Sequence, residues 1–490
     1  MQHCPSPTCP YRVRKGVASE CADTATACPD CGGALAPGEA PAAVTAGDDA
    51  PAHVPRSLRL RLVVTAIGVA LIVALGYVSL LDVGDLPAEV VGAFRFAGSP
   101  FSLIAVGVTP FLTAYALVEL VAVAVPGLRA RRVGGREARA PLRLAADLLG
   151  LALALLAAYG FAVGVQYVSS YGGPPLGLFP TMLLGFGGAV ALRLLWWILD
   201  AGALTGGVAL LLFTGAVLEL LDVTSDALTR ANLEGTTPVA ALAPMLVVGA
   251  VMVVMLALPA ALRRGLGLTA SPISLPTSGV SPMADLLVFV ALADRIAWLA
   301  GYGFDAPSLL DPVAGDLGFI VVLAVLVLGE GWLFQRPRRV ARLARGLGHP
   351  GSDLRATRRA FVIGSALTLV ALSLSGLLVS HVVAIATVLA VALDLAASWR
   401  FRRVHGALVP VRDLHRVYAV TPALAALERA GVPAHADGRC FRALFPFFAS
   451  YAPVVVLVRP EDEDAARACL HRGLHAGDPV AADVAGAFAP

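Results

Sequence analysis

Charged side chains are scarce in this chain of 490 residues. Aspartate, glutamate, lysine and arginine together make up 14% of it, whereas hydrophobic residues make up 58%. Soluble domains carry charge on about a quarter of their residues, because charged groups cover the surface that faces water. The shortage excludes an ordinary soluble protein and predicts an integral membrane protein.

The short motifs of common enzyme classes are also missing. The sequence has no phosphate-binding glycine loop, no HExxH helix and no convincing nucleophile with a base. We therefore expect that the protein is not an enzyme.

A short apolar run of the kind that forms a cleavable signal peptide is missing near the N-terminus. The first fifty-odd residues contain cysteines and are then rich in Ala, Pro and Gly. We expect no cleavable signal peptide before the first membrane span.

Apolar windows of about 20 residues, the length that a helix needs to cross the hydrocarbon of a bilayer, recur along the chain. They lie near 60–81, 101–124, 142–166, 178–199, 207–222, 239–262, 282–303, 317–335, 360–378 and 380–398. The sequence therefore predicts ten membrane-spanning helices.

Arginines gather before the first window and in every second loop after it. They are Arg56, Arg59 and Arg61; Arg129, Arg131, Arg132, Arg136, Arg139 and Arg143; Arg263 and Arg264; Arg336, Arg338, Arg339, Arg342, Arg345, Arg355, Arg358 and Arg359; and Arg400, Arg402 and Arg403. The opposite loops hold acids instead: Asp82, Asp85, Glu89, Asp222, Asp226, Glu234, Asp305, Asp311 and Asp316. Because basic loops stay in the cytoplasm, both termini are expected there.

Five of the seven cysteines lie within residues 1–35, in a segment predicted to be cytoplasmic and reducing. The stretch "CPDCGG" has the spacing and the glycines of a metal-binding knuckle. A second pair precedes it, so the segment is predicted to be a zinc ribbon with a structural Zn²⁺ held by Cys4, Cys9, Cys28 and Cys31. Cys21 and His3 are further possible ligands, and a set of free thiols is the alternative.

The chain divides by composition. Residues 36–55 are a flexible linker, residues 56–403 form the membrane region, residues 404–475 return to soluble character, and residues 476–490 are predicted to be a disordered tail.

The soluble segment is predicted to be a βαββα cytoplasmic domain. "HRVYAV" is interpreted as its first strand, "TPALAALERAG" as its first helix, "VPAHADG" and "APVVVLVRP" as two strands, and "EDEDAARACLHRG" as the last helix. The stretches "ERAGVPAHADG" and "VVVLVRPEDEDAARACL" resemble the small prokaryotic signal-transducing family of cytoplasmic domains.

One apolar stretch, "SPFSLIAVGVTPFLTAYALVELV" from Ser99 to Val121, contains a helix breaker and a carboxylate. Pro110 removes a backbone donor, so a helix must bend or restart there, and in a bilayer this is tolerated where the freed carbonyl faces protein or water. Glu119 is expected to face inward or to lie at the cytoplasmic boundary. The stretch is therefore predicted to face protein or a water-filled space inside the molecule and not only lipid.

The same stretch is similar to the second-helix signature of SecY, the channel subunit of the bacterial protein-conducting translocon. Further stretches follow in the order of that family: "WWILDAGALTGGVALLLFTGAV", "LPTSGVSPMADLL", "WLFQRPRRVARLARGLGHPGSDLRATRRAF" and "VLAVALDLAASWRFRRVHG". The resemblance covers roughly residues 56–405. It implies two inverted halves of five helices around an hourglass pore, with a lateral gate toward the lipid.

The resemblance also implies functional residues. Those at the pore constriction are Val108, Leu112, Leu212, Ala216 and Ala284, with ordinary helix packing as the alternative. Those at the lateral gate are Pro110, Glu119, Gly279 and Pro282. Arginines of the cytoplasmic loops that dock the SecA motor or the ribosome in this family correspond to Arg263, Arg264 and Arg355, although these loops are shorter or altered here.

Two functions remain open. The first is a SecY-like protein-conducting channel in the bacterial inner membrane, with SecE-like and SecG-like membrane subunits, an unfolded or nascent polypeptide as substrate, contact with lipid and no nucleic-acid ligand. The second is a non-conducting scaffold or receptor that acts through its cytoplasmic domains. A small-solute transporter would also use inverted repeats and a broken helix, but it does not predict these motifs.

Overall fold

Long apolar helices dominate the computed structural model of the chain. The residues that it describes are 2–3, 20–21, 26–28, 32–37, 58–78, 102–125, 128, 131, 136–169, 177–265, 282, 316–346, 354–378, 381–448 and 452–476.

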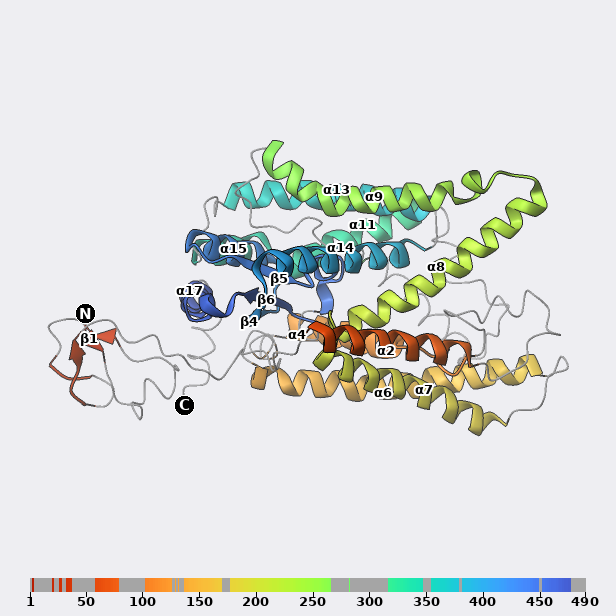
Figure 1. Ribbon diagram of the computed structural model, residues 1–490, viewed down its shortest axis with the longest axis horizontal. Helices are drawn as coiled ribbons and strands as arrows, with labels where there is room; N and C mark the ends of the chain where they lie inside the picture. The colour runs from red at the N-terminus through yellow and green to blue at the C-terminus, as the bar shows by residue number, and fades with distance from the viewer. Residues whose placement is uncertain are drawn as a thin grey trace.

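The membrane region consists of helices that lie side by side (Figure 1). Their bounds are α2 Leu58–Tyr77, α4 Thr109–Ala124, α6 Arg136–Ser169, α7 Leu178–Gly202, α8 Gly207–Glu234, α9 Pro238–Gly265, α11 Asp316–Phe334, α12 Pro337–Gly346, α13 Leu354–Leu378 and α14 Val382–His405. Such segments must be helical because lipid offers no hydrogen-bond partner to a bare backbone.

Six of the described helices are long and apolar enough to cross a membrane, namely α2, α6, α7, α8, α13 and α14. Shorter apolar helices, at 109–124, 238–254 and 320–334, coincide with three more of the expected windows. The window at 282–303 lies outside the described residues except for Pro282. The protein is thus a multi-pass membrane protein, and the count of ten spans stays a prediction.

The short turn between α7 and α8 shows why this region is rich in glycine. A Cβ atom on Gly207 would lie 2.3 Å from the backbone oxygen of Trp196, so only glycine fits. The Gly207 N–H donates a hydrogen bond of 2.6 Å to the carboxylate of Asp200, which ties the start of α8 to the end of α7. The two helices therefore form one tight hairpin.

Helix α8 is longer than its apolar window. It has 28 residues and ends where Gly235 adopts a left-handed conformation with φ of 67°. At 1.5 Å per residue, this length exceeds the ~30 Å hydrocarbon layer by roughly 10 Å. In Figure 1, α8 runs obliquely to its neighbours, and a tilt of this kind brings a longer helix within the layer.

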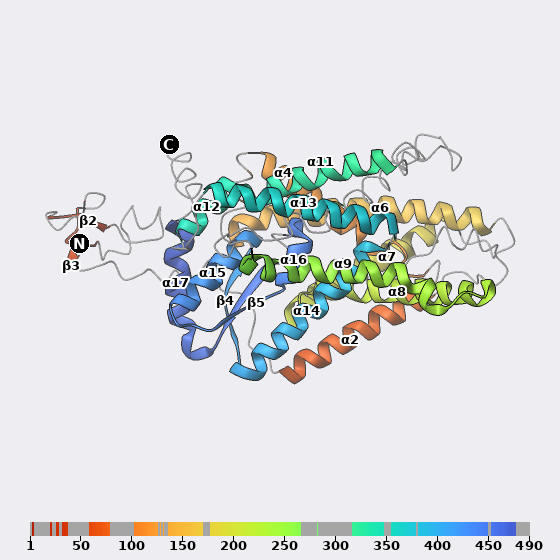
Figure 2. The ribbon, with the colours of Figure 1, turned by 90° about the horizontal axis from the view of Figure 1, so that it is seen from above.

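The C-terminal segment folds as a small α/β domain at one end of the helices (Figure 2). Its elements are β4 Val409–Leu414, α15 Val417–Arg429, β5 Ala434–Asp437, α16 Arg439–Leu444, the 3₁₀ turn η3 Pro446–Phe448, β6 Val454–Val458, a second 3₁₀ turn, η4 Pro460–Asp462, and α17 Glu463–Ala476. The strand order is β4-β6-β5, and β6 is antiparallel to both neighbours.

The first strand of this domain was predicted at the wrong place. "HRVYAV" was interpreted as a strand, but residues from Val417 onward belong to α15, and the strand is β4 before it. Tyr418 packs toward α12 and α13 while Val420 packs into the core beneath the sheet. Because α15 is buried on two sides, its first turn has the continuous apolar character of a strand.

The domain also contains an element that the sequence interpretation lacked. The short helix α16 and the turn η3 lie between β5 and β6 and pack on α14 and α4 of the membrane region. This insertion joins the two parts of the protein.

A small three-stranded sheet forms near the N-terminus. Strands β1 Gln2–His3, β2 Glu20–Cys21 and β3 Ala36–Pro37 pair antiparallel in the order β2-β1-β3. The expected linker began at residue 36, so its first two residues belong to this sheet.

Helix α7 makes a close approach that a single methyl group would prevent. A Cβ atom on Gly188 would lie 1.9 Å from the backbone oxygen of Leu103, whereas a Cβ atom on Gly187 meets nothing within 4 Å. We expect Gly188→Ala to destabilise the protein by about 1–3 kcal/mol through overpacking. Gly187→Ala should be neutral or should stabilise α7 by up to ~1 kcal/mol. Thermal unfolding of both variants in detergent checks this, and equal midpoints would contradict it.

Candidate functional site

Residues 102–108 form a short non-helical segment that leads into α4. Residues 103–106 form a turn, Gly107 has a φ of 64°, and α4 begins at Thr109. Pro110 therefore lies in the first turn of a new helix, where its missing N–H leaves no helical bond unmade. A bend or a restart of the helix was expected at this proline, and in the structure α4 begins there after a turn.

The side chains expected at the pore constriction come from α4 and α8. Val108, Leu112 and Leu212 are half-buried and pack against one large apolar cluster, and Ala216 is buried in α8. Ala284 lies outside the described residues. The structure thus places three aliphatic side chains from two distant segments of the chain against the same cluster.

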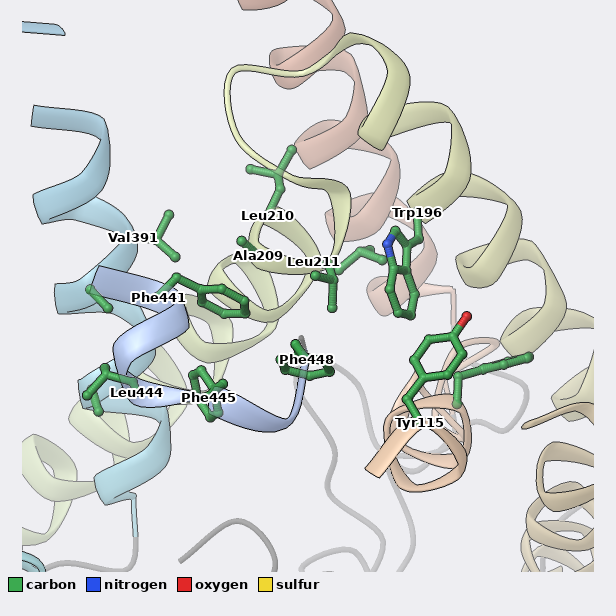
Figure 3. Packing of buried hydrophobic residues seen from close by; sticks show 14 of the residues in the cluster. Tyr115, Trp196, Ala209, Leu210, Leu211, Val391, Phe441, Leu444, Phe445 and Phe448 are labelled. Atoms are coloured by element: carbon green, nitrogen blue, oxygen red, sulfur yellow. The ribbon is translucent and has the colours of Figure 1, made fainter. Parts of the chain in front are cut away.

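Aromatic residues of the C-terminal domain complete this cluster. Phe441, Leu444, Phe445 and Phe448, from α16 and η3, are each at most 2% exposed. We call residues 441–448 the aromatic wedge. Figure 3 shows it between Val391 of α14, the start of α8 at Ala209, Leu210 and Leu211, and the pair Tyr115 and Trp196.

A buried carboxylate holds the wedge. Asp394 of α14 is 4% exposed, and its two oxygens accept hydrogen bonds of 2.8 Å from the backbone N–H groups of Cys440 and Phe441. These N–H groups begin α16, where no residue of the helix itself could accept from them. The sequence analysis did not include Asp394 or the wedge among the site residues, although the run "CFRALFPFF" is unusually aromatic for a small soluble domain.

A polar network beside the wedge fixes α4 to its neighbours. Arg193 of α7 donates to Asp147 of α6 through Nη2 at 2.8 Å and Nε at 3.1 Å, and the Tyr115 hydroxyl of α4 donates to the same carboxylate. The guanidinium also lies 4.7 Å from the ring centroid of Trp196, which meets Tyr115 edge to face. The network links three helices, and no local sequence pattern predicts it because its members lie far apart in the chain.

The sequence model of one family matches this region. The SecY model matches residues 102–389, more than half of the chain. The chain belongs to the SecY family. No curated protein matches it significantly. A solved structure described as "The structure of a protein conducting channel" is 14% identical, with 73% of this chain and 96% of that chain covered and a TM-score of 0.47.

The structure describes some of the other residues expected at the lateral gate. Glu119 of α4 is 1% exposed, so its carboxylate faces protein, one of the two positions expected for it. Pro282 is buried, whereas Gly279 lies outside the described residues. Tyr115, on the same helix as Glu119, takes part in the network with Asp147.

The arginines expected in docking loops lie on helices in this SecY-family chain. Arg263 and Arg264 belong to the last turn of α9, which extends to Gly265, and their side chains are outside the described set. Arg355 is exposed in the first turn of α13. The loop before α13 forms the helix α12, whose buried face at Val340 and Leu343 belongs to the same apolar cluster as Tyr418 of α15. The C-terminal domain therefore covers part of the surface expected for docking.

Of the expected zinc ligands, the structure describes Cys28. This residue is buried, its N–H donates to the Gly33 oxygen at 2.9 Å, and its oxygen accepts from the Gly32 N–H at 2.8 Å. Gly32 has a φ of 69°, as a tight knuckle requires. Cys4, Cys9 and Cys31 lie outside the described residues, and among the described ones no group of three or more metal-binding side chains occurs.

Two titratable groups of β5 lie where the C-terminal domain meets α14. Burial lowers the pKa of His435 to about 4, helped by Arg402 and Arg439, and this imidazole stacks on Phe401. Burial raises the pKa of Asp437 to about 6, although Arg402 and Arg61 oppose the rise. Both groups are thus held closer to neutrality than they would be in water.

These shifts predict opposite effects of acid on stability. His435 takes up its proton below pH 6.5 when unfolded but only below about 4 when folded, so it lowers stability as the pH falls between those values. Asp437 binds its proton below about 6 when folded but only below 3.8 when unfolded, so it raises stability over that range as the pH falls.

We therefore expect His435→Gln to make the protein lose less stability on acidification than the wild type, and Asp437→Asn to make it lose more. Thermal unfolding in detergent at about pH 7.5 and about pH 5 measures both changes. Each variant serves as the control for the other. Equal pH dependence in the two variants would show that the junction does not bury these groups in the folded state.

Proposed function

We propose that the protein is a protein-conducting channel subunit that translocates unfolded polypeptides or inserts them into a membrane. The observation that carries the proposal is the apolar cluster to which Leu112 of α4 and Leu212 of α8 both contribute. A pore that passes an unfolded chain while resisting ions needs compliant aliphatic side chains without fixed charge, and these positions supply them. Membership of the SecY family supports the same function.

On this proposal the polypeptide is the substrate, and the driving energy comes from a separate motor or ribosome, so the chain itself is not an enzyme. SecE-like and SecG-like membrane subunits would pack on its lipid-facing helices. The alternation of basic and acidic loops favours an orientation with both termini in the cytoplasm. Membership of the SecY family favours the bacterial inner membrane as the location.

A second function, a non-conducting scaffold or receptor, is favoured by one specific observation. The aromatic wedge fills space against the helices that carry Leu112 and Leu212, and the C-terminal domain covers α12. If this arrangement is permanent, no polypeptide passes from that side. The two functions differ in whether a substrate ever reaches Leu112.

The N-terminal segment is proposed to hold a structural Zn²⁺ through Cys4, Cys9, Cys28 and Cys31. The tight turn at Cys28 and the small antiparallel sheet support this proposal. A site made only of thiolates would stabilise the segment rather than activate water, because it leaves no open coordination position.

We expect the purified wild-type protein to contain about one zinc ion per chain and Cys28→Ser to lose most of it. Elemental analysis of both proteins, prepared without chelator, measures this. Cys469→Ser, a cysteine of α17, is the matched control and should keep the metal. Equal zinc content in wild type and Cys28→Ser would contradict the proposed site.

The channel function is tested by a photo-crosslinking residue at Leu112 in membrane vesicles that receive a stalled secretory precursor. We expect a covalent adduct that depends on the signal segment of the precursor. The same probe at Val121 is the control, since this residue lies on the same helix but is 51% exposed, toward the lipid. Adducts at both positions would indicate nonspecific contact, and an adduct at neither would favour the scaffold.

A further inference from the structure

The aromatic wedge packs between helices of the membrane region although it belongs to the C-terminal domain. It is enclosed by α4, α7, α8 and α14, which contribute Tyr115, Trp196, Leu211 and Val391 (Figure 3). An element that served only to attach a soluble domain could do so on the surface. The complete burial of its side chains among these helices calls for another explanation.

We propose that the wedge is an internal plug that closes the channel from the side of the C-terminal domain and that an arriving polypeptide displaces. This inference rests on the proposed function, because a plug has meaning only in a conducting channel. The displacing ligand is an apolar segment of an unfolded polypeptide, which competes for the same cluster.

The first argument is the shared surface. Phe441, Phe445 and Phe448 belong to the cluster against which Leu112 and Leu212 pack. The turn η3 also lies against α4, the helix that carries Leu112. A chain that approached these aliphatic side chains from the C-terminal domain would meet the wedge first.

The second argument is that the wedge is packed as a unit. The rings of Phe441 and Phe448 stack with centroids 5.8 Å apart, and that of Phe445 lies 5.1 Å from Phe441 and 6.0 Å from Phe448. Buried Arg442 donates to the backbone oxygens of Phe445 and His415, which ties the wedge to its own domain. Such a unit keeps these contacts when it moves.

The third argument is the way the wedge is attached to the membrane helices. Its hydrogen bonds to α14 run from Cys440 and Phe441 to the single carboxylate of Asp394. Gly438 precedes α16 with a φ of 74°, a conformation that glycine adopts without strain. The apolar contacts of the wedge are nondirectional, so an apolar segment of the polypeptide can replace them, while water or a polar group of that segment takes over the hydrogen bonds of Asp394.

The experiment places p-benzoylphenylalanine at Phe448 in the full-length protein in vesicles. Without precursor, the wedge should crosslink within the chain to the peptide that carries Tyr115 or the one that carries Trp196. With the stalled precursor, this internal adduct should fall at least about tenfold if wedge and precursor exclude each other. The Leu112 probe is read in parallel as the report on the channel.

Two triple variants complete the design. Replacement of Phe441, Phe445 and Phe448 by alanine removes the three rings and should increase both the precursor adduct at Leu112 and the leak of a small anion from vesicles. Replacement of the same residues by leucine keeps apolar bulk and is the matched control, with a smaller increase expected.

The outcomes separate the two proposals. An internal adduct that persists while the precursor reaches Leu112 overturns the plug and leaves the channel intact. A precursor adduct at Leu112 in the wild type, together with the fall of the internal adduct, supports both. A precursor adduct that forms only in the alanine variant overturns displacement of the wedge by the polypeptide and leaves the channel intact. No adduct at Leu112 in either wild type or the alanine variant overturns the proposed channel, and the plug with it.

Discussion

The carboxylate of Asp394 holds together the two parts of the protein. It is buried in α14 and would be costly there without partners, because a desolvated charge needs hydrogen bonds to replace water. The N–H groups of Cys440 and Phe441 supply them. The same two bonds give the first N–H groups of α16 an acceptor. The carboxylate and the start of α16 therefore each satisfy the hydrogen-bonding requirement of the other. This attachment positions the aromatic wedge, and the contacts of α15 and α17 with α12 position the rest of the C-terminal domain.

The network of Asp147, Arg193 and Tyr115 plays a comparable part within the membrane region. It holds α4, α6 and α7 together through one carboxylate and one guanidinium, and it flanks the wedge through Trp196. Gly188 lets the segment around Leu103 lie directly on α7. The side of α4 that faces α6 and α7 is therefore tightly fixed. Around Leu112, the same helix packs against the apolar cluster, whose contacts are nondirectional.

Much of the membrane region could be predicted from the sequence, because a helix in lipid leaves a local signal in a run of apolar residues. The restart at Pro110 followed from the chemistry of proline in the same way. The strand at "HRVYAV" was wrong because α15 is buried on two sides, which hides its helical periodicity. The wedge and the Asp147 network could not be predicted, since they join residues that only the tertiary structure brings together. Phe441 and Phe448 read as core residues of a small soluble domain, and no local pattern shows that their partners lie on α4, α8 and α14.

The place of the wedge in the chain has a consequence for the order of synthesis. Phe448 is made some forty residues after α14 ends at His405. At roughly 5–20 residues per second, the completed membrane helices exist for several seconds before the wedge emerges from the ribosome. During that interval the surface formed by Leu211, Trp196 and Val391 must be filled by something else, whether lipid, water or a chaperone. The newborn membrane region is thus in a different state from the mature one until its own C-terminal domain has been made.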